Sequence, residues 1–296
     1  MVNGIINVYK EAGYTSFDVV ARLRGIAGQK KIGHTGTLDP DATGVLPVCL
    51  GNATKLCEYL TDKTKEYEAG FVLGIETDTQ DISGKVTAEN YVNLVDITPD
   101  KIKAVISGFK GRQQQIPPMY SALKVDGKRL YELARNGIEV ERKPRDIEIY
   151  DIEVLNVNEK DIGIRVVCSK GTYIRTLIYD IGRQLGCGAT MTALKRTRSG
   201  AFSIETAFKL DRLEKIFKGE DELPVSDIVT PVDSVFSEYP ALTVKNEELK
   251  RVLNGNYVNH KHIGEYLRIY DPEDRFLALY VYNRRDGRYV PEKMFL

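Results

Sequence analysis

The sequence predicts an α+β protein whose main sheet is mixed and mostly antiparallel, with flanking helices. Strand-like β-branched runs and amphipathic helical runs are interspersed, without the regular strand–helix alternation that builds a parallel sheet. An apolar content of 42% and a charged content of 28% are those of an ordinary globular protein. A length of 296 residues corresponds to about two domains. We expect a larger domain over residues 1–237 and a small β-rich one over 238–296.

The expected elements follow from hydrophobic periodicity and from capping residues. Ser16 is the expected N-cap of the first helix, and Thr98 followed by Pro99 caps a later one. Residues 113–118 are expected to be a loop, and 189–198 a polar, basic strand or loop. We expect the remaining strands at 4–9, 45–50, 66–73, 146–157, 163–169, 266–270, 276–282 and 289–290. We expect helices at 17–25, 53–60, 98–109, 129–135, 172–185, 211–217 and 246–253.

The charged residues are unevenly spread, although the net charge is zero. Residues 165–198 hold seven basic residues and one acidic residue, a net of +6, whereas 205–238 hold nine acidic and four basic, a net of −5. Such asymmetry is typical of a protein with one face turned toward an anion, although an accidental run on a solvated face gives the same count. The four cysteines show neither a C-x-x-C pair nor zinc-ligand spacing. With no signal peptide or long apolar run, the expected location is the cytoplasm.

One stretch, residues 30–48, stands out as a candidate active site. It holds three glycines, two prolines, two carboxylates and a histidine. Gly33, Gly36 and Gly44 permit backbone conformations or close approaches that a side chain would block. Pro40 fixes its own φ and pushes Asp39 out of the helical region. The loop is therefore expected to hold Asp39 in one pose, although a structural turn with an Asx contact would use the same residues.

Other chemistries for this loop are weaker. Residues 39–43 fit the D-x-D-x-T pattern of aspartyl-phosphate phosphatases, but those enzymes need a buried parallel strand before the first Asp, and residues 33–38 do not read as one. The glycines do not fit a phosphate-binding loop. His34 could act in acid–base hydrolysis, but no serine or cysteine lies in a nucleophile elbow. His260 and His262 could be half of a metal site, or a surface pair.

Seven blocks in sequence resemble one known family. The first is the loop itself, Lys-Ile-Gly-His-Thr-Gly-Thr-Leu-Asp-Pro-Asp-Ala-Thr-Gly-Val-Leu-Pro at 31–47. The others are Gly-Asn-Ala-Thr-Lys at 51–55, Lys-Glu-Tyr at 65–67, Thr-Asp-Thr-Gln-Asp at 77–81, Pro-Pro-Met-Tyr-Ser-Ala-Leu-Lys at 117–124, and Lys-Gly-Thr-Tyr-Ile-Arg-Thr-Leu at 170–177 followed by Leu-Lys-Arg-Thr-Arg at 194–198. The chain thereby resembles the TruB family, bacterial synthases that make pseudouridine in tRNA.

The resemblance implies roles for three residues. Asp39 is similar to the carboxylate that attacks the target nucleoside, as a nucleophile that can also leave. Tyr67 resembles the tyrosine that stacks on the uracil and takes the proton lost when the new C–C bond forms, although a core tyrosine would look the same. Arg175 resembles the arginine that keeps the Asp ionised and aimed.

The same resemblance implies further substrate contacts. Tyr173 and Leu194 would line the pocket of the flipped base, because an apolar wall replaces its lost stacking. His34 would help to displace bases of the RNA loop, or would only hydrogen-bond within its own loop. Basic residues expected to contact phosphates are Lys10, Lys55, Lys128, Arg129 and Arg198.

The resemblance also implies the parts around the site. Residues 121–145, with seven basic residues from 124 to 145, would be an RNA-gripping insertion. Residues 238–296 would be a PUA-like RNA-binding domain. The implied reaction is isomerisation of the T-arm (TΨC) loop uridine of tRNA, without cofactor or metal, by a monomer with no obligatory protein partner or membrane. A guide-RNA-dependent synthase, a non-catalytic tRNA-binding or folding protein and the phosphatase remain alternatives.

Overall fold

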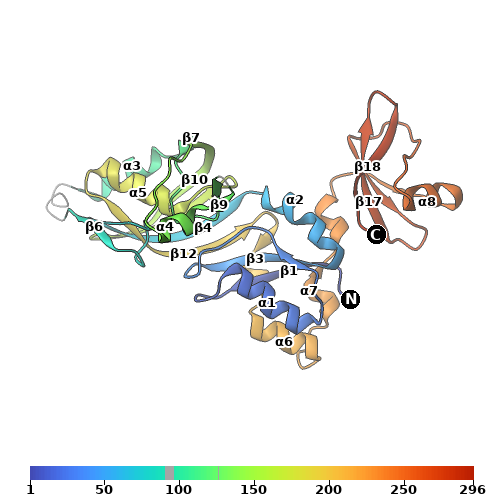
Figure 1. The fold of residues 1–296 in the computed structure, drawn as a ribbon, viewed down its shortest axis with the longest axis horizontal. Coiled ribbons are helices and arrows are strands. Elements are labelled where there is room, and N and C mark those ends of the chain that lie inside the picture. The colour runs from blue at the N-terminus through green and yellow to red at the C-terminus, as the bar shows by residue number, and fades with distance from the viewer. Residues whose placement is uncertain (91–96, 126) are drawn as a thin grey trace.

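A ten-stranded sheet forms the body of the protein in the computed structural model, which describes residues 1–90, 97–125 and 127–296. Its main path runs β14-β1-β3-β12-β4-β11-β10-β7, with β13 on β12 and β2 on β3 (Figure 1). The strands are β1 (Gly4–Lys10), β2 (Ile32–His34), β3 (Thr43–Leu50), β4 (Lys65–Leu73), β7 (Gly111–Gln115), β10 (Arg145–Asn158), β11 (Asp161–Cys168), β12 (Ala189–Ser199), β13 (Phe202–Ser203) and β14 (Val229–Thr230).

The sheet is antiparallel except at one place, so the expectation of a mixed, mostly antiparallel sheet is confirmed. There β12 runs parallel to β3 over two residue pairs, Lys195 with Thr43 and Arg196 with Gly44. This short pairing joins two antiparallel halves, one built on β1 and β3 and the other on β4, β11 and β10. The residues beside it therefore lie at the junction of the halves.

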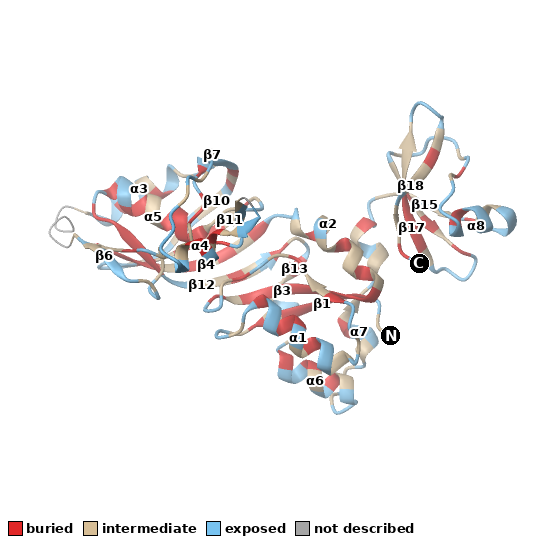
Figure 2. Cartoon of the chain, in the orientation of Figure 1, coloured by how far each residue is buried: buried red, intermediate tan, exposed pale blue. Residues whose placement is uncertain are grey.

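Helices cover each half and bury its apolar side chains (Figure 2). One cluster lies between α1 and α6 and the first half, and another between α3 and α5 and the second half. In the second cluster, the buried side chains of β11, which alternate along the strand, pack against the apolar stripe of α5. The helices are α1 (Ser16–Ala27), α2 (Cys57–Thr61), α3 (Pro99–Ser107), α4 (Leu130–Arg135), α5 (Ile174–Leu185), α6 (Leu210–Lys218) and α7 (Val225–Ile228).

The C-terminal region has a separate four-stranded sheet with its own apolar cluster. It contains β15 (Ala241–Thr243), β16 (Tyr266–Tyr270), β17 (Phe276–Asn283), β18 (Arg288–Met294) and helix α8 (Asn246–Leu253). A third cluster contains residues of both regions, with Phe236 packed against Phe276 and Phe295. Among the described helices none is long and apolar enough to cross a membrane.

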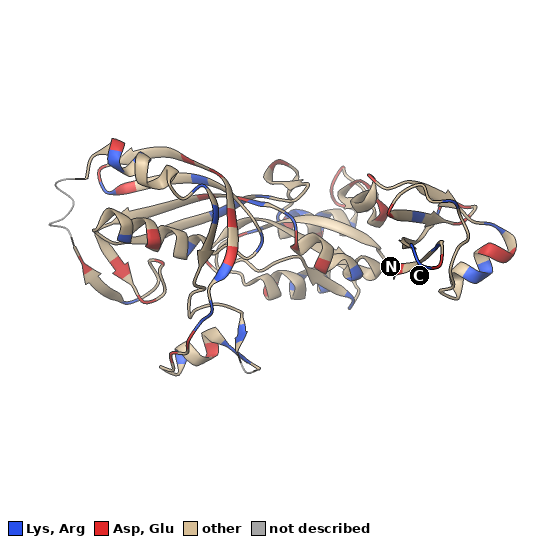
Figure 3. Cartoon of the chain, turned by 90° about the horizontal axis from the view of Figure 1, so that it is seen from above, with Lys and Arg blue, Asp and Glu red and all other residues tan. Residues whose placement is uncertain are grey.

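Two small hairpins extend from the body. The first pairs β5 (Ile75–Thr77) with β6 (Val86–Glu89). The second pairs β8 (Lys124–Val125) with β9 (Lys128–Arg129) and leads into α4, within the segment expected as an insertion. Residue 126 of that segment lies outside the described residues. Figure 3 shows the segment projecting from the body, with basic and acidic residues along it.

Four local expectations are corrected. Thr15, not Ser16, is the N-cap of α1, because its hydroxyl accepts from the Asp18 amide in a capping box. Residues 111–115, of which 113–115 were expected in a loop, form the edge strand β7 by pairing with β10. Their polar side chains give no pattern that predicts a strand. Helix α5 begins at Ile174 rather than at residue 172. Residues 32–34 pair with β3 as the strand β2.

Candidate active site

The loop between β2 and β3 presents Asp39 at the junction of the two halves of the sheet. Gly36 and Gly44 have φ angles of +117° and +105°, which side chains disfavour. A Cβ at Gly44 would also lie 2.2 Å from the Arg196 carbonyl oxygen of the neighbouring strand. The Ser16 hydroxyl accepts a 2.9 Å hydrogen bond from the Leu38 amide, which ties the loop to the start of α1. The backbone on both sides of Asp39 is thus held in place.

Lys10 lies beneath this loop and is fully buried. Its Nζ donates to the carbonyl oxygens of Pro40 at 2.8 Å, Ala42 at 2.6 Å and Glu11 at 3.1 Å. Burial lowers the pKa of Lys10 to about 8, an effect opposed by the nearby Asp39 carboxylate. The expectation that Lys10 contacts a phosphate is therefore wrong, because its ammonium group is buried and donates to three backbone carbonyl oxygens. Nothing in the local sequence distinguishes a buried lysine from an exposed one.

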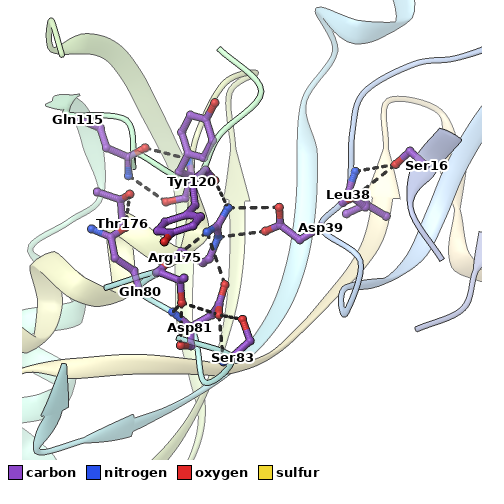
Figure 4. A network of polar contacts seen from close by, with 12 residues as sticks. Ser16, Leu38, Asp39, Gln80, Asp81, Ser83, Gln115, Tyr120, Arg175 and Thr176 are labelled. Atoms are coloured by element: carbon purple, nitrogen blue, oxygen red, sulfur yellow. Dashed lines mark hydrogen bonds and ion pairs between the residues drawn. The ribbon is translucent and has the colours of Figure 1, made fainter. Parts of the chain in front are cut away.

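Arg175 faces Asp39 from the first turn of α5 and binds it with two nitrogens (Figure 4). Its Nε lies 3.0 Å from one carboxylate oxygen and its Nη2 3.2 Å from the other. The guanidinium also donates to the carbonyl oxygens of Thr79 at 3.0 Å and Tyr120 at 2.9 Å, and lies 3.5 Å from Asp81. Such a two-pronged contact fixes both the distance and the plane of the carboxylate. The structure thus brings together the expected pair from two segments far apart in sequence.

Two opposed effects set the protonation of Asp39. Burial raises its pKa above the ordinary value, and the Arg175 guanidinium offsets part of that rise. Asp81 raises the pKa further through its negative charge. Arg175 therefore fixes the orientation of the Asp39 carboxylate, but it does not bring the Asp39 pKa down to the ordinary value.

Tyr67 lies on β4 with its side chain buried on the sheet face that also carries Arg196. The register places Tyr67 opposite Arg196 of β12 on one side and Val166 of β11 on the other. Burial raises the pKa of the Tyr67 phenol, and the adjacent Arg196 guanidinium acts to lower it. Leu194 is two residues from Arg196 on β12 and packs, half-buried, against the same apolar cluster as Tyr67.

Tyr173 precedes α5, and His34 ends the strand that leads into the Asp39 loop. The backbone of Tyr173 is held by Gln115, whose side chain both accepts at 2.8 Å and donates at 3.0 Å. Burial raises the pKa of the Tyr173 phenol. His34 is half-buried at the end of β2, and its ring contacts the exposed ring of Phe17 edge-on at 5.4 Å. Burial lowers the pKa of His34, which favours the neutral imidazole.

The remaining expected phosphate contacts have different surroundings. Arg198 forms an ion pair of 2.6 Å with Glu66, so a phosphate would have to compete with a carboxylate. Arg129 donates to the Tyr131 hydroxyl and lies over its ring, and Lys128 is exposed beside it on the small hairpin. Lys55 donates to the Met294 carbonyl oxygen at 2.8 Å, and its pKa is lowered by burial and by Lys31 and Lys293.

Several residues of the site were not expected to position Arg175 or Tyr173. Asp81, Thr79 and Tyr120 hold Arg175, and Gln115 holds Tyr173. Asp81, Thr79 and Tyr120 lie in the matched blocks at 77–81 and 117–124, so the blocks were the signal in the sequence that could have indicated a place in the site. Gln115 lies in a segment taken for a loop, and no local pattern marks it.

The described residues contain no group of three His, Cys, Asp or Glu side chains placed to hold a metal ion. Strand β2 ends at His34 and pairs antiparallel with β3. The phosphatase alternative is therefore contradicted, because it needs Asp39 at the carboxyl end of a parallel strand. Within the described part of the chain, Asp39 and Arg175 instead form a carboxylate–guanidinium pair suited to attack on an electrophilic nucleoside.

Comparison with solved structures gives the class of protein. The fold matches the structure titled "Structure of H/ACA RNP bound to a substrate RNA containing 2'-deoxyuridine" with a TM-score of 0.71 and 29% identity, covering 99% of this chain and 85% of the other. It matches the "Crystal Structure of a Cbf5-Nop10-Gar1 Complex" with a TM-score of 0.73 and 32% identity over the same shares. The fold is that of a pseudouridine synthase, with a separate small C-terminal sheet, as expected.

Sequence comparison gives the family. The model of the "TruB family pseudouridylate synthase (N terminal domain)" matches residues 24–174, and that of the "tRNA pseudouridylate synthase B C-terminal domain" matches residues 175–237. Proteins named tRNA pseudouridine synthase B are 48% identical in Lachnoclostridium phytofermentans, over 100% of both chains, and 46% identical in Clostridium novyi, over 96% of this chain and 97% of the relative. The chain belongs to the TruB family of pseudouridylate synthases, which confirms the resemblance.

Proposed function

We propose how this protein carries out its reaction, with Asp39 as the attacking group. The chain is a tRNA pseudouridine synthase, an isomerase that forms pseudouridine 55 in tRNA. The target uridine of the T-arm loop is flipped out of its stack into the space bounded by Asp39, Tyr67 and Tyr173. Asp39 attacks, the N-glycosidic bond breaks and the uracil turns. The ribose is then rejoined through C5, and the bond to Asp39 breaks, which frees the carboxylate. Tyr67 then takes the proton that leaves C5.

The observation that carries this proposal is the two-pronged pairing of Asp39 with Arg175 at the junction of the halves of the sheet. A carboxylate held by two donors presents one defined face to a substrate, and the guanidinium offsets part of the cost of its charge in a half-buried setting. Arg175 also donates to the Tyr120 carbonyl next to the insertion, so the catalytic pair and the RNA-facing segment share one anchor. The pairing favours a catalyst over a non-catalytic RNA-binding protein, which would have no use for it.

The RNA would lie across the basic and aromatic groups around the site. Lys128 and Arg129 of the hairpin, Lys55 beside Lys31 and Lys293, and Arg198 would contact phosphates. His34 and Leu194 would receive displaced and flipped bases. Residues 121–145 would grip the T arm, and 238–296 would act as a PUA-like RNA-binding domain. One chain supplies every group named, so the proposal is a cytoplasmic monomer without guide RNA or protein partner.

The test is tritium release from a T-arm transcript labelled at uridine C5, with wild type, Asp39→Asn and Asp41→Asn. Asp41 is exposed two residues away on the same loop and is the matched control. We expect turnover by the wild type and Asp41→Asn, and loss of at least about a thousandfold in Asp39→Asn because the amide is no nucleophile. Equal turnover by Asp39→Asn would contradict the mechanism. Turnover that requires an added guide RNA would contradict the stand-alone activity.

A further inference from the structure

Arg196 is a buried arginine that the proposed reaction leaves without a role. Its side chain lies on β12 and is 1% exposed, among the largest fully buried side chains described. Its Nε donates to the Val45 carbonyl oxygen at 2.7 Å, and its Nη2 lies 3.4 Å from the Gly36 carbonyl oxygen. The guanidinium thus reaches both ends of the loop that carries Asp39.

Within residues 1–90, 97–125 and 127–296, Arg196 forms no ion pair with a carboxylate. Two carbonyl dipoles satisfy some of its five N–H donors but do not neutralise its charge. Removing an unpaired cation from water costs several kcal/mol, and most buried arginines are therefore paired. A buried cation without a counter-ion indicates an anion that is present only during the reaction.

The register shows which group that anion can be. Arg196 is paired with Tyr67 on β4, so both side chains emerge on one face of the sheet, and the Arg196 guanidinium acts to lower the pKa of the Tyr67 phenol. The other titratable groups that influence Tyr67 are Cys168 on β11 and Asp39 on the loop. Burial raises the pKa of Cys168 to about 12, so that thiol stays neutral. Arg196 is thus the cation that stabilises negative charge on the Tyr67 oxygen.

We propose that Arg196 is a positioning residue of the isomerisation, which orients the Tyr67 hydroxyl and serves as the counter-ion of the Tyr67 phenolate. The proposal rests on the proposed role of Tyr67. The phenol proton passes to solvent when Tyr67 ionises. After the C1′–C5 bond has formed, the C5–H bond breaks and its proton passes to the phenolate oxygen. Its electron pair restores the C5=C6 double bond while the C6=N1 pair moves onto N1, which takes up a proton from solvent. Arg196 remains charged throughout.

The first test measures the Tyr67 hydroxyl directly. A fluorinated tyrosine, which ionises at lower pH than tyrosine, is placed at position 67, and its titration is followed by fluorine NMR. We expect its pKa to rise by at least about one pH unit in Arg196→Met, and by less in Arg196→Lys, which keeps a cation but not the planar fork. Lys195→Met is the matched control, because Lys195 is next on β12 but pairs with Glu68 on the other face.

The second test is the pH dependence of the single-turnover rate with saturating T-arm RNA. At neutral pH the rate of Arg196→Met should fall about tenfold for each pH unit by which the Tyr67 pKa rises. The loss should diminish as the pH is raised, with Arg196→Lys in between and RNA affinity unchanged. A merely structural role of Arg196 would give a loss that does not depend on pH.

Two results would overturn the proposal. One is an unchanged titration at position 67 in both Arg196 variants while circular dichroism shows them folded. The other is a pH-independent loss of rate. If the wild type itself released no tritium, the proposed function would fail, whereas the NMR titration would still decide whether Arg196 is the counter-ion of Tyr67.

Discussion

Asp39 is a carboxylate whose surroundings oppose its ionisation. Burial and the neighbouring Asp81 raise its pKa, whereas Arg175 lowers it, and the sum lies above the ordinary value of 3.8. In the proposed reaction Asp39 must be ionised to attack, so its raised pKa should limit the rate at acidic pH. The same environment makes the ionised side chain a cost to the folded state, since the charge is better solvated in the unfolded chain.

We expect the single-turnover rate to fall on acidification with a midpoint above the titration range of an ordinary aspartate. At pH 7 Asp39→Asn should unfold at no lower urea concentration than the wild type. The pKa of Asp39 is higher in the folded than in the unfolded state, so between these two pKa values the folded state binds more protons. Wild-type stability therefore falls as the pH rises through that range. The measurement is urea unfolding of both proteins between about pH 4 and pH 8, a range that starts near the ordinary pKa of a carboxylate and extends above it. A variant that is markedly less stable at pH 7 would contradict the raised pKa.

Arg175 is the residue whose geometry a lysine cannot reproduce. Arg175→Lys keeps the charge but loses the second contact to Asp39 and the contacts to the Thr79 and Tyr120 carbonyl oxygens. We expect the single-turnover rate to fall by about a hundredfold or more, because a small misplacement of a reacting group is costly. Arg183→Lys, on the exposed last turn of the same helix, is the control and should retain the wild-type rate.

At the scale of elements, the loop between β2 and β3 depends on a residue of another strand. Lys10 lies on β1 and holds the loop through carbonyl oxygens on both sides of Asp41. The loop therefore gains its shape from tertiary contacts as well as from its own glycines and prolines. Its rigidity is a property of β1, β3 and β12 together.

Lys10→Met should loosen this loop. We expect faster hydrogen exchange of the amides at 36–44, a fall in single-turnover rate and an unchanged affinity for the T arm at all salt concentrations. Lys209→Met removes an exposed lysine that pairs with Glu11 and serves as the control. If Lys10 contacted a phosphate, its loss would instead weaken RNA binding and flatten the salt dependence of affinity.

At the scale of the whole molecule, an aromatic cluster joins the body to the C-terminal region. Phe236 is 3% exposed and lies 5.6 Å from the Tyr59 ring and 6.1 Å from the Phe295 ring, between centroids. The two sheets share no strand, so this cluster is a main apolar contact between them. It fixes the orientation of the small sheet relative to the body.

Phe236→Ala should lower the free energy of unfolding by about 3–5 kcal/mol, as for other buried phenylalanines. Because both regions lose packing, urea unfolding followed by circular dichroism should shift to lower urea concentration. Tyr150→Ala removes a ring that is 44% exposed and should shift the transition little. An unchanged midpoint for Phe236→Ala would show that the cluster does not stabilise the protein.

The sequence by itself determined the parts that depend on local pattern and on matched blocks. The alternation along 163–169 and the helical periodicity before Gly186 predicted β11 and α5. The loop at 30–48, read with the blocks carrying Tyr67 and Arg175, predicted the family and supplied the candidate catalytic residues. Edge strand β7 was missed, because its polar residues become a strand only by pairing with β10.

Tertiary structure decided what each charged group is for. A lysine or arginine has the same local signal whether it is exposed or buried. Only the packing of β1 beneath the loop makes Lys10 structural, and only the register of β12 with β4 brings Arg196 to Tyr67. Burial and cross-strand register arise from contacts distant in sequence. For that reason the sequence identified the carboxylate of this site, whereas the fold alone shows which cations support it.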